Sequence, residues 1–210
     1  MKDEYRSIEM KDEYRSIEKV SQGYFKDRGS KFIAMAFPVY SEESVKQKLE
    51  EVKKKYHDAR HHCYAYRLGP GDDKWRVNDD GEPSGTAGQP IMGQIRSYRL
   101  NYILIIVTRY FGGTLLGTGG LINAYRRAAR ASLENASVIK RTIECSFLLN
   151  FPYAAMNNVM RFIREYKLRQ SEQLFEIDCS LKIHCRASEE KFIAEKLSLI
   201  EKLDFKKVND

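Results

Sequence analysis

The residues of this chain best suited to binding chemistry are arginines and glycines gathered in one segment, 83–133. The segment holds six arginines and eight glycines but no Lys, Asp or Glu, although the formal net charge of the whole chain is only +7. Arginine holds phosphate or carboxylate groups through paired hydrogen bonds, and glycine lets a backbone come close to a ligand. The segment therefore predicts a surface that binds an anion. Its arginines are Arg96, Arg99, Arg109, Arg126, Arg127 and Arg130.

The glycines of this segment bracket a loop that leads into a helix expected from Leu121 to Asn135. Backbone N–H groups at a helix N-terminus or in such a loop attract phosphate. Helical periodicity places the later arginines on one exposed side, opposite a buried stripe. The simpler alternative is that the glycines only close a turn and the arginines only solvate a face. The expected anion- or nucleic-acid-binding residues are Arg109, Tyr110, Gly112, Gly113, Asn123, Arg126, Arg127 and Arg130.

A second candidate is the acidic loop 79–88, whose sequence is DDGEPSGTAG. Its carboxylates are the ligand type that Mg²⁺ or Ca²⁺ takes, but the twelve-residue calcium-loop spacing is missing, so no metal is predicted. We expect Thr86 to cap the helix that follows and a carboxylate to orient Arg109. The loop should also form one wall of the groove beside the arginines. The expected wall residues are His62, Glu82, Ser84 and Thr86.

The histidines and cysteine of segment 57–63 form the third candidate. His57 and His61 have the i,i+4 spacing of a zinc site on a helix, but the helix expected over 41–56 ends before them. His62 and Cys63 are neighbours on an expected strand, so they point to opposite faces and do not form a catalytic pair. We expect Cys63 in the core and His62 toward the groove. No catalytic residue, metal or cofactor is predicted.

Composition limits the class of protein further. The chain has 210 residues and a sequence pI of about 9.1, which favours acidic partners, nucleic acid first. No apolar run approaches the roughly 18 residues of a membrane span, and the charged start predicts no signal peptide. The four cysteines form no CxxC pair and are interpreted as reduced thiols. A cytoplasmic protein without a membrane partner is expected.

The chain begins with a perfect repeat, because MKDEYRSIE at 1–9 recurs unchanged at 10–18. Structural repeats run over about 20–50 residues and diverge in sequence. We interpret residues 1–18 as a duplicated leader, an artefact of the start site or of cloning, and leave it out of the functional argument.

Periodicity and turn residues divide the rest of the chain into two domains, 19–136 and 137–210. In the first we expect strands over 31–40, 63–68 and 103–108 and helices over 41–56, 89–98 and 121–135, with 69–88 as a polar loop. In the second, the order strand, helix, strand, strand, helix, strand is that of ferredoxin-like domains. The fold class is therefore α+β.

Three motifs carry a resemblance to a known family. They are HCYAYR at 62–67, DGEPSGTAGQPI at 80–91 and RYFGGTLLG at 109–117. These segments are similar to the hallmark segments of the YigZ/IMPACT family, over about 23–136. The resemblance implies a first domain with the domain-2 fold of a small-subunit ribosomal protein, as in elongation factor G domain IV. It implies a ferredoxin-like second domain akin to elongation factor G domain V.

The resemblance also implies an association with translation. Eukaryotic relatives are linked to translational control through an additional N-terminal domain, which we do not expect here. The leading hypothesis is a non-enzymatic RNA- or ribosome-binding protein linked to regulation of translation. Two alternatives stay open: a small-molecule enzyme acting on a phosphorylated or peptide substrate, and a purely protein-binding regulator that docks a partner through Tyr110 and Phe111.

Overall fold

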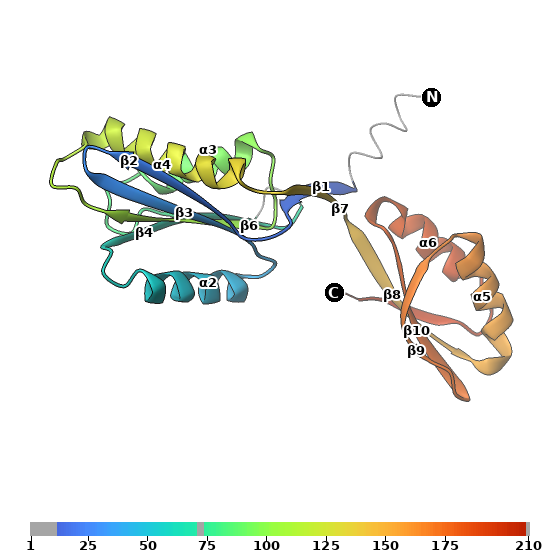
Figure 1. The fold of residues 1–210 in the computed structure, drawn as a ribbon. Helices are drawn as coiled ribbons and strands as arrows, with labels where there is room; N and C mark the ends of the chain where they lie inside the picture. Colours follow the sequence, from blue (N-terminus) through green and yellow to red (C-terminus); the bar gives the residue numbers. More distant parts are fainter. Residues whose placement is uncertain (1–11, 71–73, 209–210) are drawn as a thin grey trace, which may run out of the picture. The chain divides into compact units, whose positions relative to one another are not determined.

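The computed structural model describes residues 12–70 and 74–208, and these form two compact units (Figure 1). The first unit comprises residues 14–141. The second comprises residues 142–208 together with residues 12–13. Each unit has its own hydrophobic core, and each is described by itself. In the described residues, no helix is both long and apolar enough to cross a membrane.

The first unit is an antiparallel sheet between two helical layers (Figure 1). Helices α3 (Gly88–Ser97) and α4 (Gly117–Glu134) cover one face, and helix α2 (Glu42–Lys55) covers part of the other. The five strands lie in the order β2-β3-β6-β4-β5. Their bounds are β2 Ser21–Asp27, β3 Ser30–Pro38, β4 His61–Leu68, β5 Lys74–Asn78 and β6 Ile103–Tyr110.

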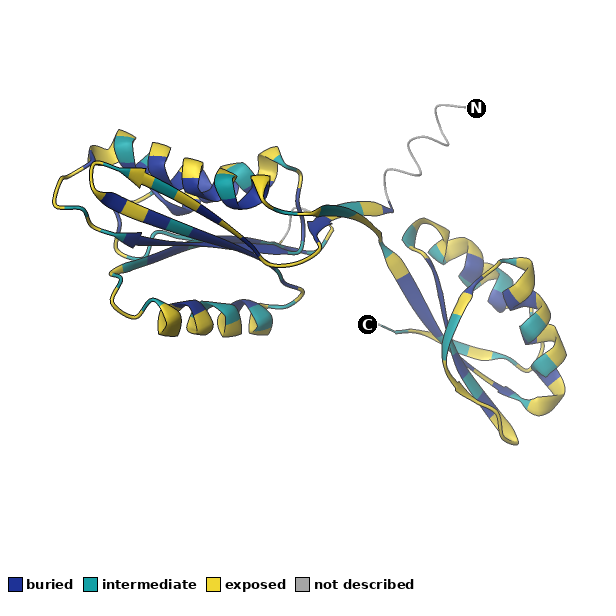
Figure 2. Ribbon diagram, in the orientation of Figure 1, coloured by how far each residue is buried: buried dark blue, intermediate teal, exposed yellow. Residues whose placement is uncertain are grey.

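The central strand β6 confirms what its continuous apolar run predicted. Successive side chains of a strand point to opposite faces, so both faces of β6 must be covered. Ile105 and Val107 pack in the core under α3 and α4, whereas Leu104 and Ile106 pack in the core on the α2 side. Figure 2 shows this burial in dark blue along the middle of the sheet and on the inward sides of the helices. Strand β6 thus contributes side chains to two hydrophobic cores, one on each face of the sheet.

Helix α2 begins as its sequence predicted. The Ser41 hydroxyl accepts a hydrogen bond from the Ser44 N–H, and the Ser44 side chain accepts one from the Ser41 N–H, which forms a capping box. Glu42 and Glu43 lie in the first turn, where the helix dipole favours negative charge.

Two edge strands and one helix start differ from the prediction. Strand β2 was not predicted at all, and β5 lies within the segment expected to be a loop. Edge strands bury few side chains and therefore contain many polar residues, so their sequences give a weak strand signal. In β2, Gly23 also lowers strand propensity, yet a Cβ there would lie 2.1 Å from the backbone nitrogen of Ser132 in α4. Helix α4 begins at Gly117, four residues before the predicted start. Its first turn was not predicted because glycine, present at 117, 119 and 120, is a poor helix former.

The second unit has the predicted strand and helix order. Its antiparallel sheet runs β11-β8-β10-β9, and helices α5 and α6 cover one face of it (Figure 1). Apolar residues of β8 and β10 alternate into the core beneath these helices. The bounds are β8 Glu144–Pro152, α5 Met156–Glu165, β9 Arg169–Leu174, β10 Asp178–Arg186, α6 Glu190–Leu197 and β11 Asp204–Val208.

The second copy of the nonamer takes part in the fold. Strand β1 (Glu13–Ile17) pairs with strand β7 (Val138–Thr142), and the Arg15 carbonyl accepts a hydrogen bond from the Asn101 N–H at 2.8 Å. Ile17 is fully buried in the core beneath α3 and α4. The first copy, 1–9, lies outside the described residues. The origin of the duplication therefore stays a prediction, but its second copy supplies a structural strand.

Shortening Ile17 to valine is expected to lower the free energy of unfolding by about 0.5–1.5 kcal/mol, because a buried methylene is removed. Chemical denaturation followed by circular dichroism would measure the change. Val20→Ala is the control, since Val20 is 45% exposed and should change stability by less than about 0.5 kcal/mol. Equal effects of the two substitutions would contradict a core role for β1.

Candidate functional site

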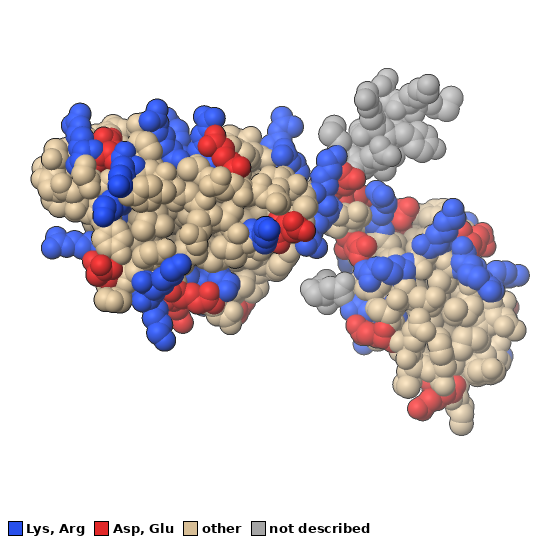
Figure 3. Space-filling view, viewed as in Figure 1, with Lys and Arg blue, Asp and Glu red and all other residues tan. Residues whose placement is uncertain are grey.

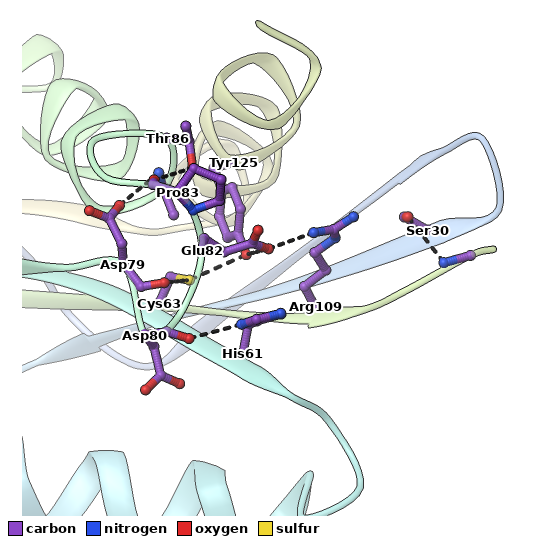
Figure 4. A network of polar contacts seen from close by, with 12 residues as sticks. Ser30, His61, Cys63, Asp79, Asp80, Glu82, Pro83, Thr86, Arg109 and Tyr125 are labelled. Atoms are coloured by element: carbon purple, nitrogen blue, oxygen red, sulfur yellow. Dashed lines mark hydrogen bonds and ion pairs between the residues drawn. The ribbon is translucent and has the colours of Figure 1, made fainter. Parts of the chain in front are cut away.

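The acidic loop begins with a tight turn that directs one carboxylate into the protein. The Glu82 N–H donates to the Asp79 carbonyl at 2.9 Å, and the two residues between them, Asp80 and Gly81, have φ of 42° and 86°. Two successive positive φ angles are those of a type I′ turn, which Asp-Gly sequences favour. The turn reverses the chain so that Glu82 points inward (Figure 4).

The carboxylate of Asp79 caps helix α3. It accepts hydrogen bonds from the backbone N–H groups of Gly85 at 2.8 Å, Ala87 at 2.9 Å and Gly88 at 2.8 Å. The N–H groups of Ala87 and Gly88 would otherwise be left without partners at the helix start. The prediction that Thr86 caps this helix is wrong, because its hydroxyl donates to the Pro83 carbonyl at 2.7 Å. Asp79 therefore has a structural task that occupies both of its oxygens.

Glu82 accepts hydrogen bonds from two partners inside the first unit (Figure 4). Its Oε1 atom accepts from Arg109 Nη1 at 2.7 Å and from the Tyr125 hydroxyl at 2.8 Å. The Cys63 thiol lies 3.2 Å from the Tyr125 hydroxyl and 2.9 Å from the Asp79 carbonyl oxygen. Burial raises the pKa of both Cys63 and Tyr125. Both groups therefore keep their protons and act as donors rather than nucleophiles.

The structure corrects the expectation that Arg109 lines an open groove. Arg109 is 6% exposed and Glu82 is 9% exposed, and the guanidinium lies 5.6 Å from the Phe32 ring and 5.7 Å from the Phe111 ring. The expectation that a carboxylate orients Arg109 is confirmed, with Glu82 as that carboxylate. Glu82 and Thr86 are buried and do not form a groove wall, whereas Ser84 is exposed.

His62 and Tyr110 lie on the other face of the sheet. His62 is opposite Thr108 in the register of β4 and β6, and its Nε2 atom is 3.1 Å from the Tyr56 carbonyl oxygen. Tyr110 follows Arg109 on β6 and therefore points the opposite way. Its hydroxyl donates to Asp58 at 2.7 Å, which raises the pKa of Tyr110 to about 12. The prediction that His62 faces the arginine groove is therefore wrong, whereas Cys63 lies in the core as expected.

Gly112 is required by packing rather than by a ligand. A Cβ at Gly112 would lie 1.9 Å from the carbonyl carbon of Gly29 and 2.0 Å from the nitrogen of Ser30. Gly29 and Arg28, with φ of 79° and 43°, form the two-residue type I′ turn between β2 and β3. Gly113 has φ of 86°, and no described atom lies within 4 Å of a Cβ added there. The two glycines of the motif thus have different environments.

The exposed side of α4 is as its periodicity predicted. Asn123, Arg126, Arg127 and Arg130 are all exposed. Arg130 Nε donates to Glu134 at 2.7 Å, and the Arg127 guanidinium lies 5.3 Å from the ring of Phe25 on β2. Figure 3 shows Lys and Arg side chains along the outward side of α4, with some acidic residues among them.

The sequence reasoning missed a basic hairpin beside this helix. The turn between β2 and β3 carries Lys26, Arg28 and Lys31, all exposed. The signal was present in the segment YFKDRGSK at 24–31, where two aromatic residues are followed by three basic residues around a turn glycine. Among the described residues, no group of three or more His, Cys, Asp or Glu is arranged to hold a metal ion.

Comparisons with known proteins match the part of the chain that contains the motifs at 62–67, 80–91 and 109–117. A family model described as the Impact N-terminal domain matches residues 28–133. IMPACT family member YvyE of Bacillus subtilis (strain 168) is 36% identical over 136 residues, which cover 65% of this chain and 63% of the relative. IMPACT family member YigZ of Escherichia coli (strain K12) is 36% identical over 132 residues, which cover 62% of this chain and 65% of the relative.

The matched segments span less than two thirds of the length of these two relatives. A crystal structure of a protein described only as hypothetical aligns with 95% of this chain and 98% of its own length, at 26% identity and a TM-score of 0.70. The two-unit architecture is therefore shared with a solved structure, while that structure's description gives no function.

Proposed function

Because this chain belongs to the IMPACT family, we propose that it is a non-enzymatic RNA- or ribosome-binding protein of the cytoplasm that takes part in regulating translation. Two lines support the link to translation. The family resemblance implies it through the eukaryotic relatives, and both domains are expected to resemble domains IV and V of elongation factor G.

The observation that carries the proposal is the row of arginines on α4. Arg126 and Arg127 are exposed, and neither has an ion-pair partner in the described part of the chain. Arg127 presents its guanidinium against the ring of Phe25, a contact that orients the side chain without neutralising its charge. Arg130, one helical turn beyond Arg126, adds a third exposed guanidinium, which is paired with Glu134. Exposed guanidinium groups held on a rigid helix suit the phosphates of a polynucleotide.

The buried network argues against the enzymatic alternative. Its titratable groups, Cys63, Glu82, Arg109 and Tyr125, contact one another in the interior. The raised pKa of Cys63 and of Tyr125 keeps both groups protonated, whereas a nucleophile or general base needs a lowered or well-matched pKa. The network therefore supports the fold of the loop rather than a reaction.

Replacing Arg126, Arg127 and Arg130 together with alanine is expected to weaken the binding of structured RNA at least tenfold at about 0.1 M salt. Each lost phosphate contact should also reduce the slope of log K against log salt by about 0.7–0.9. Filter binding across a salt series would measure both quantities. A parallel sedimentation series with ribosomal subunits would test the ribosome as the RNA source.

The matched control also removes three exposed positive charges, with Arg161→Ala and Arg164→Ala on α5 and Lys167→Ala two residues after it. If this control weakens binding as much as the α4 variant, the effect is one of net charge alone. Absence of binding by the unaltered protein at low salt would reject the proposal.

A protein-binding role is the second candidate, favoured by one observation. Phe111 is 54% exposed and Leu115 is 82% exposed in the loop between β6 and α4. Ribosome association that survives nuclease treatment but is lost in Phe111→Ser/Leu115→Ser would favour this candidate over RNA binding.

A further inference from the structure

Two lysines lie directly opposite each other on the β2–β3 hairpin. The register pairs Lys26 with Lys31, and it pairs Lys31 in turn with Tyr110 on β6. Adjacent strands are about 4.8 Å apart, so like charges in this position repel each other and destabilise the sheet. Both lysines are exposed, and no described residue forms an ion pair with either of them. The sheet therefore tolerates a concentrated positive charge at this point.

The two nearest acidic residues do not form an ion pair with either lysine. Asp27 is opposite Ser30 in the register, so it points to the face that α4 covers. The Asp58 carboxylate accepts the hydrogen bond of the Tyr110 hydroxyl at 2.7 Å. A bound anion would supply the missing negative charge between Lys26 and Lys31.

Two tyrosines flank the lysines on the same face of the sheet. Tyr24 lies two residues before Lys26, is 49% exposed, and has its ring centre 5.4 Å from Lys26 Nζ. Tyr110 completes the row on the other side, and Asp58 fixes its hydroxyl. We name these four residues, Tyr24, Lys26, Lys31 and Tyr110, the lysine–tyrosine face.

Helix α2 leaves this end of the sheet uncovered. On β3 and β6, the residues that pack in the core with α2 are Met35 and Phe37 of β3 and Leu104 and Ile106 of β6. These lie toward the opposite ends of the same strands, and the lysine–tyrosine face lies beyond them.

We propose that the lysine–tyrosine face binds single-stranded RNA, with the lysines on phosphates and Tyr24 stacked on an unpaired base. Exposed rings beside cations match a strand that offers both phosphates and accessible base faces. A duplex hides its base faces within the stack, so it could use the lysines but not the tyrosine. The proposal rests on the proposed function, because it names the form of RNA recognised. It also places a contact on the face of the sheet opposite the α4 arginines.

The test is fluorescence polarisation with a 5′-labelled 12-nucleotide oligouridine and with a labelled 12-base-pair RNA duplex. Tyr24→Ala is expected to weaken binding of the single strand about fivefold or more, because stacking on an aromatic ring contributes strongly per base. Tyr24→Phe keeps the ring and should retain the affinity. Lys26→Gln/Lys31→Gln should reduce the slope of log K against log salt by roughly 1.4, which is about 0.7 for each lost phosphate contact.

Two controls match these substitutions at exposed positions outside the lysine–tyrosine face. Tyr40→Ala removes a tyrosine that is 54% exposed, and Lys46→Gln/Lys54→Gln removes two exposed charges from α2. Neither should change the affinity for the single strand by more than about twofold.

The outcomes separate this inference from the proposed function. If Tyr24→Ala binds the single strand like the unaltered protein while the α4 variant still loses affinity, the lysine–tyrosine face is overturned and the proposed function stands. Equal losses for Tyr24→Phe and Tyr24→Ala would overturn the stacking role. If the unaltered protein binds neither RNA at low salt, both proposals fail.

Discussion

Replacing Glu82 with alanine is expected to lower the free energy of unfolding by about 3–5 kcal/mol, because it leaves a buried guanidinium without its counter-charge. Arg109 is 6% exposed, and its Nε atom already has no hydrogen-bond partner in the described residues. The substitution also removes the acceptor of the Tyr125 hydroxyl, which lies 2.8 Å from Glu82. Urea unfolding followed by circular dichroism would measure the loss.

Two variants separate the charge from the hydrogen bond. Tyr125→Phe removes a single hydrogen bond to Glu82 and should cost only about 1 kcal/mol. The double substitution Glu82→Leu/Arg109→Met replaces both charges with apolar groups and should cost less than Glu82→Ala alone. A loss below about 1 kcal/mol for Glu82→Ala would show that the pair does not stabilise the loop.

Replacing Gly112 with alanine is expected to lower the free energy of unfolding by about 3 kcal/mol or more, because the new methyl group overlaps backbone atoms. The Cβ would lie 1.9 Å from the Gly29 carbonyl carbon and 2.0 Å from the Ser30 nitrogen. Both are backbone atoms at the tight turn of the β2–β3 hairpin, so the overlap cannot be relieved by moving a flexible side chain. The same denaturation measurement applies.

Gly119 in α4 provides the matched control for Gly112. No described atom lies within 4 Å of a Cβ added at Gly119, and the residue is helical. Gly119→Ala should therefore raise stability by about 0.5–1 kcal/mol. A Gly112→Ala protein as stable as the unaltered one would contradict the close approach.

Because the displaced hairpin carries Lys26 and Lys31, Gly112→Ala should also weaken single-stranded RNA binding, and Gly119→Ala should not.

The sequence by itself determined the features that depend on local periodicity. The apolar run at 103–108 predicted the central strand, because only a strand covered on both faces can be apolar throughout. The serine cap of α2 was also readable, since its hydrogen bonds join residues three apart. The exposed arginines of α4 followed from the helical repeat, and the six-element order of the second unit followed from successive apolar segments.

Alternation along a strand could have corrected one error. Arg109 and Tyr110 are neighbours on β6, so they cannot share a face. The same rule correctly separated His62 from Cys63, yet the predicted binding surface joined Arg109 and Tyr110. The edge strands β2 and β5 were harder to recognise, because a strand with one paired side buries few residues and carries few apolar ones.

Only the tertiary structure decided which charges are buried and which are brought together. Glu82 and Arg109 are 27 residues apart, and they meet because a type I′ turn points Glu82 inward and β6 carries Arg109 beneath α4. Lys26 and Lys31 face each other only because the hairpin turn fixes their register. Local periodicity specifies which side of an element is buried, but long-range pairing specifies which residues meet. For this protein, that difference moves Arg109 from the expected binding surface into the interior and places a pair of lysines on the opposite face.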